Sequence, residues 1–153
     1  MSVWIEVAGG DGAWKDKLLQ HKETKRGLRA PAATRYQHLL EVIEPGDLLL
    51  TYLTLHRTTT REWRSAIVGI SEITSRMTQV SHTLKIETGR DTELVHSIKF
   101  SEFKSIPELS ENFRKAIGFC MQRYIVGISE ADFRILAAIY PENESLLRSE
   151  GFL

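Results

Sequence analysis

The chain has 153 residues, 42% of them hydrophobic and 26% charged, and its 20 basic residues balance its 20 acidic ones. This length fits one domain with its own core. Because the net charge is zero, we do not expect strong non-specific binding of the whole molecule to a polyanion. The single cysteine excludes an internal disulfide, and we find neither a secretory signal nor an apolar run near the roughly 18 residues of a membrane span. We therefore expect one cytoplasmic domain over residues 1–153, with no membrane partner.

The first third of the chain mixes one strand with short helical segments. Residues 3–8, VWIEVA, alternate as a strand does and run into GGDG, which favours a turn. Residues 13–21 suit a short helix. Residues 22–34 lose this periodicity and predict an irregular, cation-rich arm, and residues 33–43 resume helical spacing.

The middle of the chain predicts several strands. Pro45-Gly46-Asp47 ends the preceding helix, and the short apolar runs LLLTYL, SAIVGISEIT, HTLKIET and LVHSIKFSEF follow it. Gly89-Arg90-Asp91, between the last two runs, favours a turn. Because too few helices separate these runs to form parallel crossovers, we expect a mixed or antiparallel sheet.

The last third returns to helical spacing. IPELSENFRKAIGFCMQRYIV alternates apolar and polar residues at helical intervals. Ser129, followed by Glu130 and Asp132, has the pattern of an N-cap with acids in the first turn. That N-cap opens a final amphipathic helix reaching Tyr140, and PENESLLRSEGFL after it is interpreted as a tail or a cut linker.

Positive charge gathers in one segment. Between Lys15 and Leu40 there are seven basic and two acidic residues, a net charge of about +5. Any phosphate contact is therefore expected from the first third of the chain. A solvated basic face that binds nothing would show the same pattern.

The sequence contains no recognisable catalytic motif. Its five histidines have no metal-ligand spacing, and no phosphate-binding glycine motif or GxSxG nucleophile motif is present. We therefore expect no enzyme activity, no cofactor and no metal.

Taken in order, these segments resemble the EVE family of the PUA-like superfamily, which is related in fold to YTH and ASCH domains. The resemblance rests on VWIEV, the basic RGLR with its glycine, a helix ending in PGD, LLLTYL with its tyrosine, IVGISEIT, and RYIVGISEADFRIL. It covers about Val3 to Tyr140 and implies an α+β fold, a PUA-like mixed β-barrel of about five or six strands with peripheral helices. The chain departs from the family pattern at Lys25-Arg26 and at Leu53-Thr54.

The resemblance also implies a function. Such a barrel is expected to hold a pocket that reads a modified base, for example a methylated one, flipped out of DNA or RNA. The residues expected to line the pocket are Trp14, Tyr52, Trp63 and Thr54. The residues expected to contact the phosphate backbone are Arg26, Gly27, Arg29, Arg35 and Arg123, with Gly27 allowing close backbone approach.

Each candidate has a structural alternative. Strand alternation places Tyr52 on the opposite face from Thr51 and Leu53, and an aromatic there could equally serve the core. Trp63 could cover a hairpin, and Arg123 could form an ion pair. A purely core role is expected for Trp4.

Three classes of function stay open at this point. The first is the base reader, and the second is an RNA-binding housekeeping module that recognises the shape of tRNA or rRNA. The third is a small-molecule sensor that uses the same pocket. The domain is expected either to act alone or to be the specificity domain of a modification-dependent restriction or anti-phage system, fused to or associated with a nuclease or NTPase.

Overall fold

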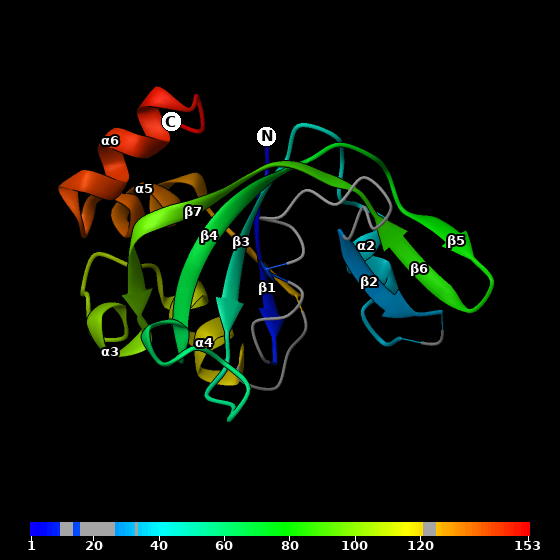
Figure 1. Cartoon of the computed structure of the whole chain (residues 1–153), viewed down its shortest axis with the longest axis horizontal. Helices are drawn as coiled ribbons and strands as arrows, with labels where there is room; N and C mark the ends of the chain where they lie inside the picture. Colours follow the sequence, from blue (N-terminus) through cyan, green and yellow to red (C-terminus); the bar gives the residue numbers. More distant parts are fainter. Residues whose placement is uncertain (10–13, 16–26, 33, 121–124) are drawn as a thin grey trace.

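The computed structural model of the protein contains two sheets and a set of short helices (Figure 1). It describes residues 1–9, 14–15, 27–32, 34–120 and 125–153, with the backbone alone for residues 116–120. The larger sheet has the order β7-β4-β3-β1-β8, and the smaller one the order β2-β6-β5. The predicted α+β class is confirmed. The second sheet adds three strands beside the five of the first.

The larger sheet is mixed, as predicted. β1 lies parallel to β3 and antiparallel to β8, whereas β3–β4 and β4–β7 are antiparallel. Its strands are β1 (Val3–Ala8), β3 (Leu48–Leu53), β4 (Ala66–Ile73), β7 (Thr88–Lys99) and β8 (Ile125–Ile128). The smaller sheet contains β2 (Leu28–Pro31), β5 (Thr78–Val80) and β6 (Thr83–Ile86). In Figure 1 the ribbon passes from β6 into the long β7, so this segment links the two sheets.

Helices cover one face of the larger sheet. They are α3 (Phe100–Phe103), α4 (Glu111–Cys120), α5 (Glu130–Ala138) and α6 (Pro141–Ser149). Their buried residues, among them Phe103, Phe113, Phe133 and Leu136, pack on inward-facing strand residues such as Ile5. Burial of each such side chain contributes about 1.5–3 kcal/mol, so this face holds much of the apolar core.

The opposite face of the larger sheet carries two further apolar clusters. One joins Trp4 of β1 to Leu28 of β2 and Ile86 of β6, so it fills the space between the sheets. α2 (Gln37–Leu40) contributes Leu40 to this cluster. The other cluster surrounds Trp14. The expected core role of Trp4 is confirmed, because only 8% of this residue is exposed.

The turn signal PGD has a clear physical role. The carboxylate of Asp47 accepts hydrogen bonds from the backbone N–H of Ser2 (2.9 Å) and of Glu44 (3.0 Å), and from Nε1–H of Trp4 (3.1 Å). Gly46 has φ +94°, a left-handed conformation that glycine adopts without steric cost. The turn therefore fixes the start of β3 beside β1.

The predicted N-cap at Ser129 is also confirmed. The Ser129 hydroxyl accepts a hydrogen bond from the backbone N–H of Asp132 (3.0 Å). The buried Asp132 carboxylate accepts two more from Ser110, from its N–H (2.9 Å) and its hydroxyl (2.8 Å). Burial by itself would raise the pKa of Asp132, but the hydrogen bonds from Ser110 and Ser129 outweigh it, and the pKa is lowered.

Several sequence predictions were wrong. Part of the expected irregular arm is β2, because Leu28 and Ala30 are buried and pair with β6. The expected turn at Gly89-Arg90-Asp91 lies inside β7, where the register against β4 shifts and Arg90 has φ +50°, so these residues form an irregularity in a long strand.

The interpretation of the C-terminal segment as a tail or linker was also wrong. It contains α6, which begins with Pro141, a residue favoured in the first turn of a helix. Leu147 and Phe152 are buried in the core. The helix expected over residues 33–43 is limited to α2, and the one expected over residues 13–21 lies mostly outside the described residues.

Candidate nucleic-acid interface

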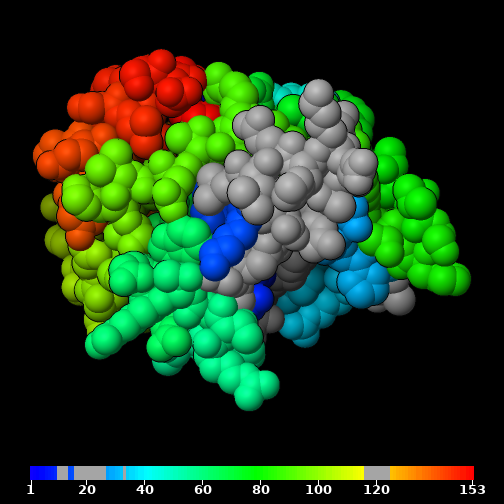
Figure 2. Space-filling view, in the orientation of Figure 1, coloured from blue at the N-terminus to red at the C-terminus, as the bar shows by residue number. Residues whose placement is uncertain are grey.

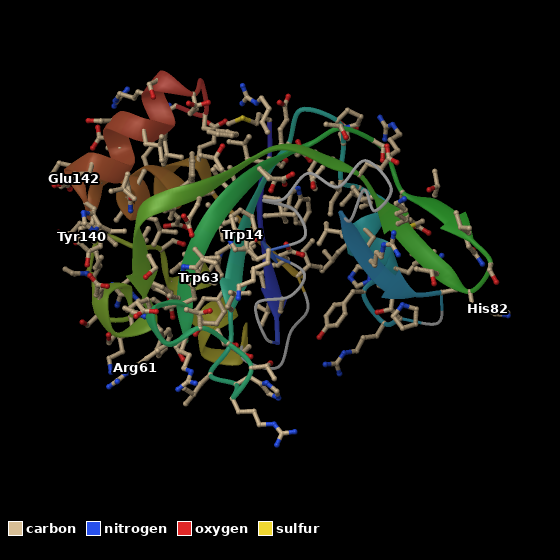
Figure 3. All side chains as sticks on the ribbon, in the orientation of Figure 1. Trp14, Arg61, Trp63, His82, Tyr140 and Glu142 are labelled. Atoms are coloured by element: carbon tan, nitrogen blue, oxygen red, sulfur yellow. The ribbon has the colours of Figure 1, made fainter. Side chains whose placement is uncertain are left out.

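Two of the three predicted pocket aromatics lie together at one end of the larger sheet. Trp14 is fully buried in a cluster with Leu53, Ala66 and Val68, and the partly exposed Trp63 packs against that cluster. Figure 3 shows both rings on the same side of β3 and β4, one above the other. We call this group, with Ala8, the aromatic cluster. Residues 49 positions apart in the sequence thus pack in one cluster.

Trp14 is seated against the backbone of β4. A Cβ atom added to Gly69 would lie 2.0 Å from Cζ2 and 2.2 Å from Cη2 of the Trp14 ring. Only glycine leaves room for the ring at this position. The register places Gly69 opposite Thr51 of β3, so the ring lies over the centre of the sheet rather than beyond its edge.

A buried polar pair crosses β1 and β3 on this face. The Thr51 hydroxyl donates a hydrogen bond to Oε1 of Glu6 (2.8 Å), and Thr51 and Glu6 are only 1% and 7% exposed. A carboxylate is a hydrogen-bond acceptor that suits the exocyclic amino group of cytosine or adenine. The prediction from sequence missed this pair. Its signal is a charged residue between the apolar residues of VWIEVA, matched by a threonine within the apolar run LLLTYL.

Tyr52 lies on the other face of β3. It is 2% exposed and packs in the core beneath the helices, with Leu50 and Ile67. The predicted alternation is confirmed, because Leu53 lies in the aromatic cluster on the opposite face. The structure therefore brings Trp14 and Trp63 together and separates Tyr52 from both.

Thr54 lies at the rim of the aromatic cluster. It follows the last residue of β3, it is partly exposed, and its backbone N–H donates to the carbonyl of Ala8 (3.0 Å). Its hydroxyl oxygen would be 3.8 Å from a Cβ added to Gly9. The parallel strands β1 and β3 thus end side by side here and present Thr54 and Gly9 at the surface.

The predicted phosphate contacts belong to the smaller sheet and its neighbourhood. Arg29 lies on the exposed face of β2, and the exposed Arg35 donates to the hydroxyl of Tyr36 (2.8 Å) with its guanidinium 5.0 Å from that ring. A Cβ added to Gly27 would be 1.8 Å from the carbonyl oxygen of Ile86, so the close approach of Gly27 is to β6. Arg26 and Arg123 lie outside the described residues.

Cations that were not predicted flank Trp63. The β3–β4 loop, residues 54–65, carries the exposed Arg57 and Arg61, and neither guanidinium group makes an ion pair or hydrogen bond within the described part of the chain. Figure 3 shows the Arg61 side chain at the lower edge of the molecule, below the Trp63 ring. The signal in the sequence is three arginines within eight residues around Trp63, in HRTTTREWR.

Within the described ranges, histidine, cysteine and acidic side chains form no group of three or more that could hold a metal ion. No helix in this part of the chain is long and apolar enough to cross a membrane.

Several solved structures have a similar fold over most of the chain. A protein from Agrobacterium tumefaciens, Atu2648, matches with a TM-score of 0.65 and 14% identity, over 93% of this chain and 97% of the other. Human THYN1, an EVE-domain protein solved in complex with DNA containing 5-methylcytosine, matches with a TM-score of 0.60 and 16% identity, over 91% and 98%. The N-terminal domain of Staphylothermus marinus McrB matches with 0.58 and 11%, over 88% and 92%.

These matches confirm the PUA-like fold suggested by the resemblance to the EVE family. No family sequence profile matches the chain, and no curated protein matches it in sequence. The likeness is therefore one of three-dimensional structure, with identities of 11–16% in the three comparisons above.

Proposed function

We propose that this protein is a nucleic-acid-binding domain that reads a modified base, without catalysis, at the end of β3. The observation that carries the proposal is the aromatic cluster: Trp14 and Trp63, distant in sequence, lie over one strand pair beside a buried carboxylate. Support comes from the solved THYN1 complex, in which a domain of the same fold is bound to DNA containing 5-methylcytosine.

The residues have distinct parts in this proposal. The partly exposed Trp63 offers a ring face for stacking, a contact worth about 1–3 kcal/mol per base. Trp14 supports it from within the fold, and Thr54 lies at the entrance. Glu6, held by Thr51, would accept a hydrogen bond from the amino group on the edge of the base. A base in this position would be held by both its face and its edge.

The charge distribution suits a modest electrostatic contribution. The chain is neutral overall, so affinity would rest on a few cations, chiefly Arg57 and Arg61 beside Trp63 and Arg29 on β2. We expect binding to weaken with salt less steeply than in a strongly basic protein. We also propose that the protein acts as a specificity domain within a larger system. Support comes from the match to the N-terminal domain of McrB, in which this fold is one domain of a longer chain.

Binding to a panel of oligonucleotides tests this proposal. Fluorescence anisotropy would compare single- and double-stranded DNA and RNA carrying one 5-methylcytosine, 5-hydroxymethylcytosine or N6-methyladenine with the unmodified sequence. We expect a preference for one modified base, and Trp63→Ala should reduce that preference by about tenfold, the lower part of the range for one stacked base.

A matched control uses the exposed Arg29. Arg29→Gln should weaken modified and unmodified ligands alike, because a phosphate contact carries no base information. If the wild-type protein shows no preference for any modified base, base reading is wrong. RNA binding without such a preference would instead favour recognition of shape. If Trp63→Ala keeps the full preference, the site lies elsewhere.

A further inference from the structure

The β3–β4 loop carries an exposed apolar side chain close to its start, two residues after the end of β3. Leu55 is 74% exposed, which is more than Met1 or any of the exposed valines in the described residues. It directly follows Thr54 at the rim of the aromatic cluster. Figure 2 shows this part of the chain projecting from the lower edge of the molecule. An exposed leucine on a projecting loop gains nothing for the isolated fold.

The base of the same loop is firmly anchored. Thr59 is 2% exposed, and its carbonyl accepts a hydrogen bond from Nε–H of Arg64 (2.9 Å). The carbonyl of Glu62 accepts hydrogen bonds from the hydroxyl of Ser97 (2.8 Å) and from the ammonium group of Lys99, both on β7. A turn connects Leu55 to this anchored part, since the backbone N–H of Thr59 donates to the carbonyl of His56 (2.9 Å). The loop therefore holds Leu55 out from a fixed base.

Cations flank this leucine. Arg57 lies two residues beyond it and Arg61 at the start of the short 3-10 helix η1 (Arg61–Trp63), and both are exposed. Glu62 is the single acid of the loop, so residues 54–65 carry three arginines against one carboxylate, a net charge of +2. An exposed leucine followed closely by exposed arginines fits a surface that is negative at its margins and apolar within. A nucleic-acid duplex has this character, with phosphates outside and stacked bases inside.

We propose that Leu55 is a wedge that enters a duplex and occupies the place of the flipped base, while Arg57 and Arg61 contact the flanking phosphates. This inference rests on the proposed function and makes it more specific, because a wedge is useful only where the base leaves a double helix. Apolar side chains inserted between base steps act in this way in proteins that distort duplexes. The ligand is therefore double-stranded rather than single-stranded.

The test compares the affinity of wild type and of one variant for single-stranded and double-stranded ligands. Leu55→Ala and wild type would be titrated against the modified oligonucleotide that the wild type prefers, once as a single strand and once as a duplex. We expect Leu55→Ala to weaken duplex binding by about tenfold, the effect of losing one buried leucine-sized contact, and to leave single-strand binding within about twofold. A duplex with an abasic site opposite the modified base should reduce the difference, because its stack is already weakened.

The control is Val95→Ala, an exposed apolar residue on β7 (56% exposed) that should leave both affinities unchanged. Because Leu55 is exposed, its replacement should not change the thermal midpoint. Equal losses on single strand and duplex, or no loss on either, would refute the wedge. If the wild type prefers no modified base, the proposed function fails and the wedge fails with it. If the wild type prefers a modified base but Leu55→Ala leaves duplex affinity unchanged, the wedge is refuted and the proposed function stands.

Discussion

The contact between Trp14 and Gly69 gives the sharpest test of the site. In Gly69→Ala the new Cβ would lie 2.0 Å from Cζ2 of Trp14, which is 1.4 Å inside the 3.4 Å where ordinary contact begins. It would also be 2.8 Å from the carbonyl oxygen of Thr92 on β7, so the ring cannot relieve the clash by moving alone. Gly69 does not have a positive φ, and the cost is therefore steric rather than conformational.

The magnitude follows from two opposing terms. Overpacking of a filled core costs about 1–3 kcal/mol, and the stiffer unfolded chain of an alanine variant offsets about 0.4–1 kcal/mol of it. We expect a net loss of about 1–2 kcal/mol in the free energy of unfolding, or roughly 2–4 °C in the thermal midpoint for each kcal/mol at this chain length. Base preference should fall too, because Trp14 supports Trp63.

The assay is urea unfolding followed by tryptophan emission. Displacement of the buried Trp14 ring should shift the native emission to longer wavelength in Gly69→Ala. Gly9→Ala is the matched control, since among the described residues its Cβ would meet only the Thr54 hydroxyl oxygen, at 3.8 Å, and the backbone change is the same. If Gly69→Ala unfolds and emits as Gly9→Ala does, Trp14 is not seated on β4 and our account of the site is wrong.

Two further predictions concern buried polar groups. Thr51→Val removes the hydroxyl bonded to Glu6 and should cost about 1–3 kcal/mol of stability together with part of the base preference, whereas the exposed Thr83→Val should change neither. Asp132→Asn should cost about 1–3 kcal/mol at pH 7 by urea unfolding. Because the pKa of Asp132 is lowered in the folded state, its contribution is complete above the unfolded value of about 4 and is lost as the pH falls through the folded pKa. Wild type should lose stability in that acid range more steeply than Asp132→Asn, and parallel profiles would contradict the assignment.

The strands of the larger sheet were the most predictable part of the fold. β1, β3 and β4 are short apolar runs bounded by turn residues, and alternation correctly put Tyr52 and Leu53 on opposite faces. Alternation does not say which face the helices will cover, because that depends on residues far along the chain. Sequence alone therefore groups Tyr52 with Trp14 and Trp63, although Tyr52 lies under the helices.

The remaining errors have a common physical origin. Gly89 and Asp91 are turn residues by type, but pairing of β7 with β4 absorbs them as a strand irregularity. The arm around Leu28 looks irregular until β6 pairs with it. In the sequence Glu6 is an ordinary polar residue of a strand. Its special role comes from the hydrogen bond that Thr51 donates to it from β3. In each case a partner distant in sequence decides the structure, and local preference yields to it.

The position of β1 between β3 and β8 has a consequence for how the molecule forms. Val3 pairs with Ile128, which lies 125 residues further along the chain, and also with Leu48. The first strand of the sheet thus acquires its second neighbour only after the last strand of the sheet, β8, has been made. Such long-range pairing is entropically costly and slows the search for the native state, so β8 is expected to complete the sheet late in folding.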